Sequence, residues 1–279
     1  TGENAQTTAD SALTKSTANE GELKAFASNG TGNEAIATGT NSVAVGIGSA
    51  VTSTNSVAVG NAARASGTDS LALGAGANAD SQGSIAIGKD GIAGGQGALA
   101  LGNLARANGA SAIAMGSEAI ASGSSSISLG LLSRSTGQGS LAVGSNARAI
   151  RDNAISIGNN SLSQGAKGIA IGDSAVVVGD NTTAIGASAR ATRMGATAIG
   201  ANAAATGTNS VAVGIGSVAI ADNTFSVGAQ GNTRRITNVA AGIDGTDAIN
   251  KGQFDQALTD VSASVDAAQT TANNAQTTG

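Results

Sequence analysis

The sequence predicts an all-β fold, a parallel solenoid of 14-residue coils that is followed by a short α-helical coiled coil. The main observation is a run such as Ser42–Gly46, Ser-Val-Ala-Val-Gly, which recurs every 14 residues without an insertion or deletion. A strict internal period of this kind indicates a repeat architecture. We call the last residue of each run the closing glycine; these are Gly46, Gly60, Gly74, Gly88, Gly102, Gly116, Gly130, Gly144, Gly158, Gly172, Gly186, Gly200, Gly214 and Gly228.

Each 14-residue copy contains two segments that alternate with period two. Before the closing glycine, a small residue stands between two aliphatic ones, as in Leu71-Ala72-Leu73. Three residues after the glycine, two small residues are spaced two apart, as at Ala63 and Ala65. Alternation of this kind predicts short β-strands. Two strands and two turns therefore fit into each copy.

A helical repeat is the competing interpretation, because 14 residues are close to four helical turns. Several glycines or turn-forming Asn, Asp and Ser residues interrupt every copy and disfavour a helix. Coils stacked about 4.8 Å apart would give two parallel sheets in a rod on the order of 65 Å long.

We expect the large aliphatic pair and the small pair to face each other inside a narrow roll, so that the middle residue of each run points outward. A roll this thin buries little apolar surface and is barely stable alone, which predicts an obligate oligomer. The flat column of small residues would then be the surface between chains. It comprises Ala44, Ala58, Ala72, Ala86, Ala100, Ala114, Ala142 and Ala170.

The composition excludes several functional classes. The 279 residues include no Cys and no His, so disulfides, thiolate metal sites and Ser-His catalysis are ruled out. We predict no catalytic residue, metal or cofactor, and no enzyme. A net charge of −4 from few charged residues argues against nucleic acid or an anionic membrane as partner. No apolar run approaches the roughly 20 residues of a membrane-spanning helix.

The repeat divides the chain into four predicted parts: a segment without the period (residues 1–31), the solenoid (32–232), a charged connecting segment (233–253) and the start of a coiled coil (254–279). The first segment echoes residues 268–273 of the last and is either a stalk-like piece or a polar, unstructured terminus. Coiled-coil spacing of four, three, four and three is found at Phe254, Leu258, Val261, Val265 and Ala268. The residues that we expect to contact other chains from the connecting segment are Arg234, Arg235, Asn238, Asp244, Asp247, Asn250 and Lys251.

The repeated Ser-Val-Ala-Val-Gly run resembles the head repeat of trimeric autotransporter adhesins (YadA-like heads), and the segment Arg235–Phe254 resembles their neck. The resemblance implies a left-handed parallel β-roll, a homotrimer, and a Gram-negative outer surface. Any membrane attachment would come from a C-terminal anchor beyond this sequence. Thr183 and Thr197 replace the first aliphatic residue of the run, and Phe254 stands where the family usually has leucine.

The fourth residue after each closing glycine is flanked by two inward small residues and must face outward. It is aliphatic at Ile92, Ile120, Leu162, Val176 and Val218. One interpretation is that this column is a ligand-binding surface, repeated three times in the trimer. The other is that the arginines serve solubility and the aliphatic residues contact a second subunit. The arginines are Arg64, Arg106, Arg134, Arg148 and Arg190.

These observations leave two functional classes. The first is a rigid adhesin head without catalytic activity, for which the resemblance implies host extracellular-matrix proteins or cell-surface receptors as partners. The second is an ice-binding or other structural solenoid, which would need aligned Thr columns where this sequence has scattered ones. A left-handed acyltransferase helix is disfavoured further by its shorter repeat and by the lack of His.

Overall fold

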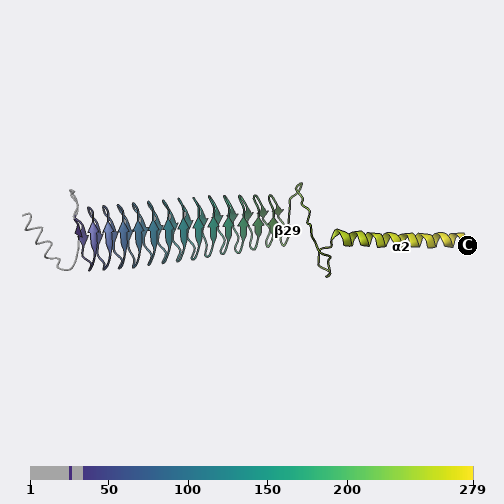
Figure 1. Cartoon of the computed structure of the whole chain (residues 1–279), viewed down its shortest axis with the longest axis horizontal. Helices are drawn as coiled ribbons and strands as arrows, with labels where there is room; N and C mark the ends of the chain where they lie inside the picture. Colours follow the sequence, from purple (N-terminus) through teal and green to yellow (C-terminus); the bar gives the residue numbers. More distant parts are fainter. Residues whose placement is uncertain (1–24, 27–33, 279) are drawn as a thin grey trace, which may run out of the picture. The chain divides into compact units, whose positions relative to one another are not determined.

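The computed structural model describes residues 25–26 and 34–278, in two compact units, Thr1–Asn232 and Thr233–Gly279. The first unit is a solenoid in which each coil contributes one strand to each of two parallel sheets (Figure 1). This confirms the predicted arrangement of two strands and two turns per 14 residues.

The two sheets take alternate strands of the chain. The first sheet contains β1 (Ala25–Phe26), β3 (Val43–Val45), β5 (Val57–Val59), β7 (Leu71–Leu73), β9 (Ile85–Ile87), β11 (Leu99–Leu101), β13 (Ile113–Met115), β15 (Ile127–Leu129), β17 (Leu141–Val143), β19 (Ile155–Ile157), β21 (Ile169–Ile171), β23 (Thr183–Ile185), β25 (Thr197–Ile199), β27 (Val211–Val213) and β29 (Phe225–Ser226). The second contains β2 (Ile36–Ala37), β4 (Ala50–Val51), β6 (Arg64–Ala65), β8 (Asn78–Ala79), β10 (Ile92–Ala93), β12 (Arg106–Ala107), β14 (Ile120–Ala121), β16 (Arg134–Ser135), β18 (Arg148–Ala149), β20 (Leu162–Ser163), β22 (Val176–Val177), β24 (Arg190–Ala191), β26 (Ala204–Ala205) and β28 (Val218–Ala219).

Equivalent residues of successive coils stand next to each other. From β3 onward the first sheet keeps an offset of 14, as in Ile113↔Ile127 and Met115↔Leu129. Strand β1 differs, because Ala25 pairs with Ala44 at an offset of 19. The first sheet therefore begins within the segment predicted to lack the period. The predicted echo between residues 5–10 and the C-terminal segment lies outside the described residues.

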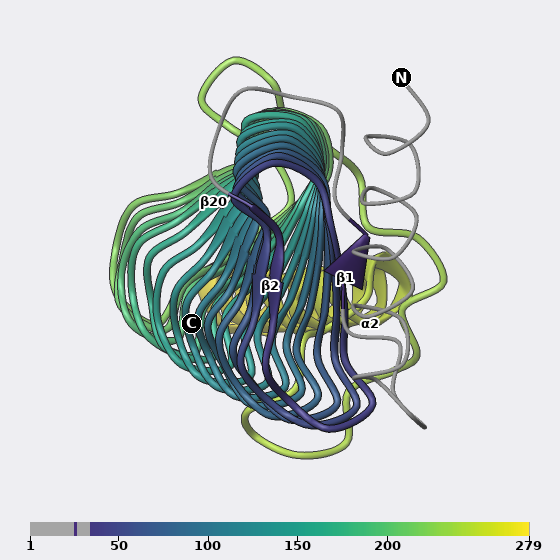
Figure 2. The same ribbon diagram turned by 90° about the vertical axis from the view of Figure 1, so that its left-hand side faces the viewer.

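A left-handed backbone conformation recurs every seven residues from Asn41 to Asn223, twice in each coil. The residue stands third in a four-residue turn such as Gly60–Ala63, where Ala62 has φ 55° and Ala63 N donates to Gly60 O at 3.2 Å. A positive φ at this place is typical of a type II turn and explains the frequent Asn and Gly there. Both turns share one geometry, and viewed along the stack the coils have the same outline and follow one another with a progressive rotation (Figure 2).

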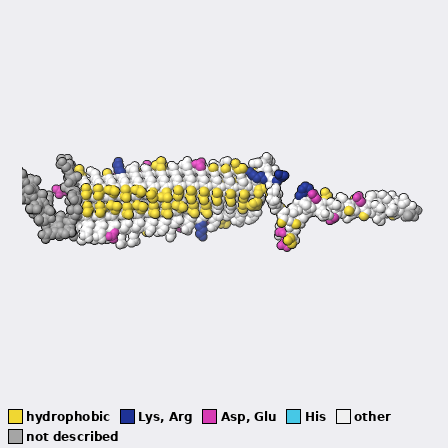
Figure 3. Space-filling model, in the orientation of Figure 1, with side chains coloured by type: hydrophobic (Ala, Val, Ile, Leu, Met, Phe, Trp, Pro, Cys, Tyr) yellow, Lys and Arg dark blue, Asp and Glu magenta, His cyan; other side chains and the backbone are white. Residues whose placement is uncertain are grey.

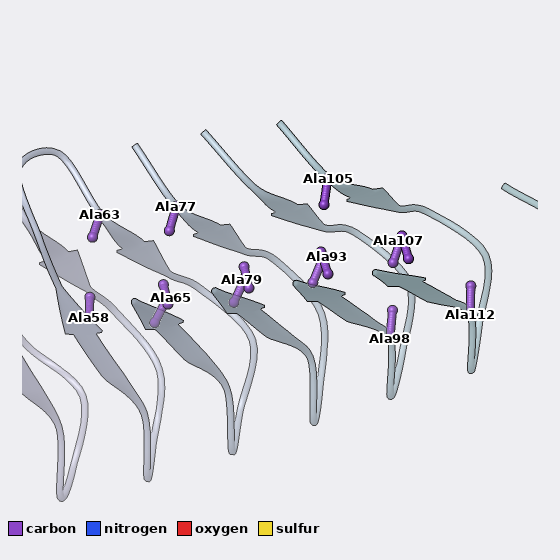
Figure 4. Packing of buried hydrophobic residues seen from close by; sticks show 14 of the residues in the cluster. Ala58, Ala63, Ala65, Ala77, Ala79, Ala93, Ala98, Ala105, Ala107 and Ala112 are labelled. Carbon is purple, nitrogen blue, oxygen red and sulfur yellow. The ribbon is translucent and has the colours of Figure 1, made fainter. Parts of the chain in front are cut away.

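The core between the sheets consists almost entirely of small side chains. Each coil sends four residues inward, as Ser56, Ala58, Ala63 and Ala65 do in one coil, each with an exposed fraction of 0%. Figure 4 shows alanine methyl groups from both sheets lying between the two layers of strands. Two strands joined by such tight turns leave little room between them, and the largest side chains enclosed there are Val51 and Val177.

The prediction for the two faces of the first sheet was therefore wrong. The large aliphatic residues point outward, and the small middle residue points into the core of its own chain. The eight alanines expected between chains are each 0% exposed in a single chain, so their side chains cannot reach another one; they are Ala44, Ala58, Ala72, Ala86, Ala100, Ala114, Ala142 and Ala170.

The alanine core gives way to serine in the middle of the solenoid. Three pairs of buried hydroxyl groups form across the roll there, with Oγ–Oγ distances of 2.7 Å for Ser128–Ser133, 2.6 Å for Ser135–Ser140 and 2.7 Å for Ser156–Ser161. Paired hydroxyls escape most of the cost of burying a polar group. Each pair joins a strand residue to the residue that directly precedes the next strand, which belongs to the other sheet.

Close backbone contact between coils explains the invariable closing glycine. Gly102 has φ 143°, and a Cβ there would lie 2.5 Å from Gly116 O and 2.7 Å from Gly116 C. A real Cβ cannot approach backbone atoms so closely, and an L-residue rarely adopts that φ. The same contact recurs from Gly46 to Gly200, so no larger residue fits this column.

The second unit contains an extended segment followed by helix α2 (Lys251–Thr278). The helix begins three residues before the predicted start of the coiled coil. Asn250 caps it, because its Oδ1 accepts a hydrogen bond from Gln253 N at 3.0 Å, and Gln253 Oε1 accepts one from Asn250 N at 3.2 Å. This reciprocal pair is a capping box.

Replacing a closing glycine should destabilise the solenoid, whereas replacing a glycine of the left-handed turn position should not. Gly102→Ala should lower the free energy of unfolding by about 3 kcal/mol, since either a coil must shift or the backbone must strain. Gly97 has φ 63°, and a Cβ there would meet nothing nearer than 3.9 Å. Gly97→Asn is therefore the matched control. Thermal unfolding measures both variants, and equal melting temperatures would contradict the role of the closing glycines.

Candidate functional site

The most extensive surface feature is a band of aliphatic side chains on the outer face of the first sheet. It is formed by the first and third residues of the odd-numbered strands from β3 to β27, and we call it the double aliphatic stripe. These side chains are only partly buried in a single chain; the exposed fraction is 41% at Leu73 and 40% at Ile199. In Figure 3 the stripe runs as two adjacent rows along the whole solenoid.

Two neighbouring threonines are the polar exceptions in this stripe. Thr183 and Thr197 are register partners in β23 and β25 and are partly exposed. They replace large residues that we expected inside the roll, but they lie on the outer face, so they do not enter the core of the chain. All the remaining positions of the stripe, from β3 to β27, hold Val, Leu, Ile or Met.

The outward position on the second sheet is confirmed. All five predicted arginines are exposed: Arg64, Arg106, Arg134, Arg148 and Arg190. Four of the aliphatic residues in the same column, Ile92, Ile120, Leu162 and Val176, are partly buried, and Val218 is exposed.

The register places arginines and aliphatic residues side by side along the second sheet. Arg134 pairs with Arg148, and Ile120 lies between Arg106 and Arg134. Within residues 34–278 the ion pairs are Lys89–Asp90 and Lys251–Asp255, so the five arginine side chains have no acidic partner there.

The connecting segment folds back on itself through side-chain hydrogen bonds. Gln253 holds both the N–H and the C=O of Gly242, at 2.8 and 3.0 Å. Asp247 Oδ2 accepts hydrogen bonds from Ile243 N at 3.0 Å and Asp244 N at 3.1 Å. These two backbone donors, that of Ile243 first, hold the pKa of Asp247 below its ordinary value of 3.8.

Several residues expected to contact other chains from this segment have partners in their own chain. Asp247 closes the turn just described, Asn250 Nδ2 donates to Val239 O at 3.1 Å, and Lys251 forms an ion pair with Asp255, Nζ–Oδ1 2.8 Å. Arg235, Asn238 and Asp244 are exposed and Arg234 is partly buried. Contacts of these residues with a second chain stay a prediction.

Helix α2 exposes the apolar seam predicted for a coiled coil. Phe254, Leu258, Val261 and Val265 are each more than half exposed in the single chain. Aliphatic residues at this spacing are covered when further copies of the helix pack against them.

Among the residues with described positions, no helix is long and apolar enough to cross a lipid bilayer, and no three acidic side chains gather where they could bind a metal ion.

Comparison with protein-family models decides the family. The C-terminal unit matches the coiled stalk of trimeric autotransporter adhesin over residues 235–277. The solenoid matches the YadA head domain repeat over residues 37–63, 65–90, 93–119, 107–133, 121–147, 135–161, 149–175, 163–189, 178–203 and 205–230. The chain belongs to the YadA-like trimeric autotransporter adhesins. This confirms the resemblance drawn from the repeated run and from the neck.

Among solved structures, the chain is similar to the collagen-binding domain of Yersinia adhesin YadA. The two are 26% identical, the match covers 70% of this chain and 86% of that one, and the TM-score is 0.32. No curated protein matches the chain. Family membership therefore rests on the head-repeat and stalk matches.

Acidification should open the turn closed by Asp247. Because the pKa of Asp247 is lowered in the folded state, its carboxylate stabilises the turn above the ordinary value of 3.8, and this stabilisation is lost as the pH falls through the folded-state pKa. Asp247→Asn should have the same effect at neutral pH. Hydrogen exchange at the amides of Ile243 and Asp244 measures both.

Asp244→Asn is the control, since the Asp244 carboxylate does not close this turn. Equal exchange rates in the Asp247→Asn variant and the unaltered protein at pH 7 would show that the two hydrogen bonds do not hold the turn.

Proposed function

We propose that the protein is the head and upper stalk of a homotrimeric adhesin on the surface of a Gram-negative bacterium. It is not an enzyme; it attaches the cell to host extracellular-matrix proteins or to receptors on host cells. Membership of the YadA-like adhesins is the observation that carries this proposal. The rigid stack of coils supports it, because such a rod holds its surface away from the membrane that anchors it.

The double aliphatic stripe is the surface through which the three chains associate. A soluble protein seldom leaves a continuous apolar band of this length in water. Three copies that turn their stripes toward a common axis cover it, and the seam of α2 continues the same association into the stalk. The polar exceptions Thr183 and Thr197 would form two adjacent layers in this interface.

The ice-binding alternative has no support in the surface of the solenoid. Its flat, regular outer face carries aliphatic side chains of varied size, whereas an ice-binding face would carry aligned threonines. The outward column of the second sheet mixes arginines, aliphatic residues and Asn78, and it is also not a threonine array.

Charges placed in the double aliphatic stripe should separate the chains. Ile113→Lys combined with Ile127→Lys puts two lysines on adjacent rungs, and each buried, unpaired charge costs roughly 3–5 kcal/mol. We expect light scattering to show a loss of trimer and a lower melting temperature.

Ile120→Lys is the matched control, because Ile120 is a partly buried outward residue of the second sheet. This variant should remain trimeric. If the Ile113 and Ile127 variant kept both its mass and its melting temperature, the proposed interface would be wrong.

The arginines of the second sheet should contribute to adhesion. Removing both Arg134 and Arg148 by substitution with Gln leaves the fold intact, because both side chains are exposed. With a loss of about 1 kcal/mol per contact, repeated in three chains, binding should fall more than tenfold. The measurement is attachment of the purified trimer to collagen, fibronectin, laminin and cultured cells.

Arg64→Gln combined with Arg190→Gln removes the same number of charges from rungs that are far apart, and this variant should bind more strongly than the Arg134 and Arg148 variant. Unchanged adhesion of both variants to every target would mean that the arginines serve only solubility. No attachment of the unaltered trimer to any target would contradict the adhesin proposal.

A further inference from the structure

Two leucines occupy backbone positions that leucine disfavours. Leu104 and Leu132 both have φ 57°, at the left-handed position of the turn that follows the closing glycine. Equivalent positions in other coils hold Gly, Asn or Asp, or else Ala62, Glu118, Ser174 and Ser188, so leucine is the one large aliphatic residue found there between residues 41 and 223. Side chains other than Gly, Asn and Asp enter this region at a cost in free energy.

Burial within the chain offsets only part of that cost. The exposed fraction is 36% at Leu104 and 47% at Leu132, and the adjacent Leu131 is 50% exposed. The stability of a single chain therefore explains leucine at these turns only in part. Strained residues that the fold does not require are typical of binding sites.

Each of these leucines is followed two residues later by an outward arginine. In Leu104-Ala105-Arg106 and Leu132-Ser133-Arg134 the middle residue is buried in the core, so the leucine and the arginine on either side of it both face solvent. The two units lie two coils apart, which is about 10 Å at the usual strand spacing.

Further residues complete an apolar and basic surface. Arg148 is the register partner of Arg134, and Leu131 adjoins Leu132. The exposed Glu118, at the left-handed position of the coil between the two units, is the acidic residue among them. We define the leucine–arginine patch as Leu104, Arg106, Leu131, Leu132, Arg134 and Arg148. Its three cations outnumber the two neighbouring anions, Glu118 and Asp90, and Asp90 forms an ion pair with Lys89 at 4.0 Å.

We propose that the leucine–arginine patch binds a segment of a partner protein in which carboxylates stand beside apolar side chains. This inference rests on the proposed adhesin function and names the chemistry of its partner. Arginines pair with carboxylates through two parallel hydrogen bonds, while the leucines cover apolar side chains. A sulfated polysaccharide would use the arginines alone and would leave the strained leucines without a role.

The experiment uses the whole trimer and replaces both leucines with a residue that suits their backbone. Leu104→Asn combined with Leu132→Asn should raise the melting temperature by about 2–4 °C, since the strain is relieved. The same variant should bind a fluorescent 12-residue peptide of alternating Glu and Leu about tenfold more weakly by anisotropy. Its binding to a Glu-Ser peptide and to heparin should not change.

Ala62→Asn is the matched control, because Ala62 has φ 55° at the same turn position outside the patch. It should raise the melting temperature and leave peptide binding unaltered. Glu118→Gln should strengthen binding of the Glu-Leu peptide, since it removes the anion next to the arginines.

Four outcomes overturn the proposal. The first is that the unaltered trimer does not bind the Glu-Leu peptide saturably. The second is that the leucine substitutions leave this binding unchanged. The third is a fall in melting temperature with loss of trimer, which would make these leucines a contact between subunits. The fourth is arginine-dependent binding of heparin alone, which would assign the patch to sulfated polysaccharides.

Failure of this inference is distinguishable from failure of the adhesin proposal. A trimer that attaches to matrix or cells equally well with and without its leucines remains an adhesin, but one with another contact surface. A trimer that attaches to no host target but binds the peptide through its leucines keeps the patch and loses the proposed host function.

Discussion

The constraint on which this structure depends is the distance between the backbones of successive coils at the closing glycine. Each glycine hydrogen atom points at the carbonyl group of the next closing glycine, in space that no Cβ could enter. This contact fixes the path of the chain as it leaves the first sheet, and the left-handed residue every seven positions fixes the turns. Together they impose a constant, narrow spacing between the two sheets. Ala, Ser, Thr and Gly fill this space almost everywhere, and the largest exceptions are Val51 and Val177.

An interior filled with methyl and hydroxyl groups supplies little hydrophobic stabilisation. Backbone hydrogen bonds between coils make the stack regular, but each contributes little net free energy. The larger apolar side chains are excluded from the core by size and lie on the outer face, where only another chain can cover them. We therefore expect folding of this solenoid to be coupled to association, and its stability to depend on the concentration of chains. The same reasoning applies to helix α2, whose apolar seam is exposed until further copies join it.

Much of the fold could be predicted from the sequence, because a period of 14 and an alternation of two determine strands, turns and register. Alternation alone does not say which face is inside, and the assumption that larger residues fill the core led to the wrong choice. The variation in size was the available signal: the outward position of Leu71 varies from Val to Ile to Thr among coils, while the position of Ala72 is always Ala or Ser. A core of constant thickness requires the constant residue. The capping box at Asn250 and Gln253 could also have been predicted from the sequence, because Asn is followed three residues later by Gln.

The binding surface could not be derived in the same way, because a repeat indicates a specific site only at positions where the residue differs between coils. Inward positions and closing glycines tolerate almost no change, so differences between coils gather on outward strand positions and at turns. Most of these differences suit their backbone, as Asn and Gly do at left-handed turns. Leu104 and Leu132 are the large aliphatic exceptions, and they occur next to the arginines that the outward column supplies. A residue that opposes the local conformational preference and remains exposed needs a reason outside the chain, and a partner that contacts both leucine and arginine provides one.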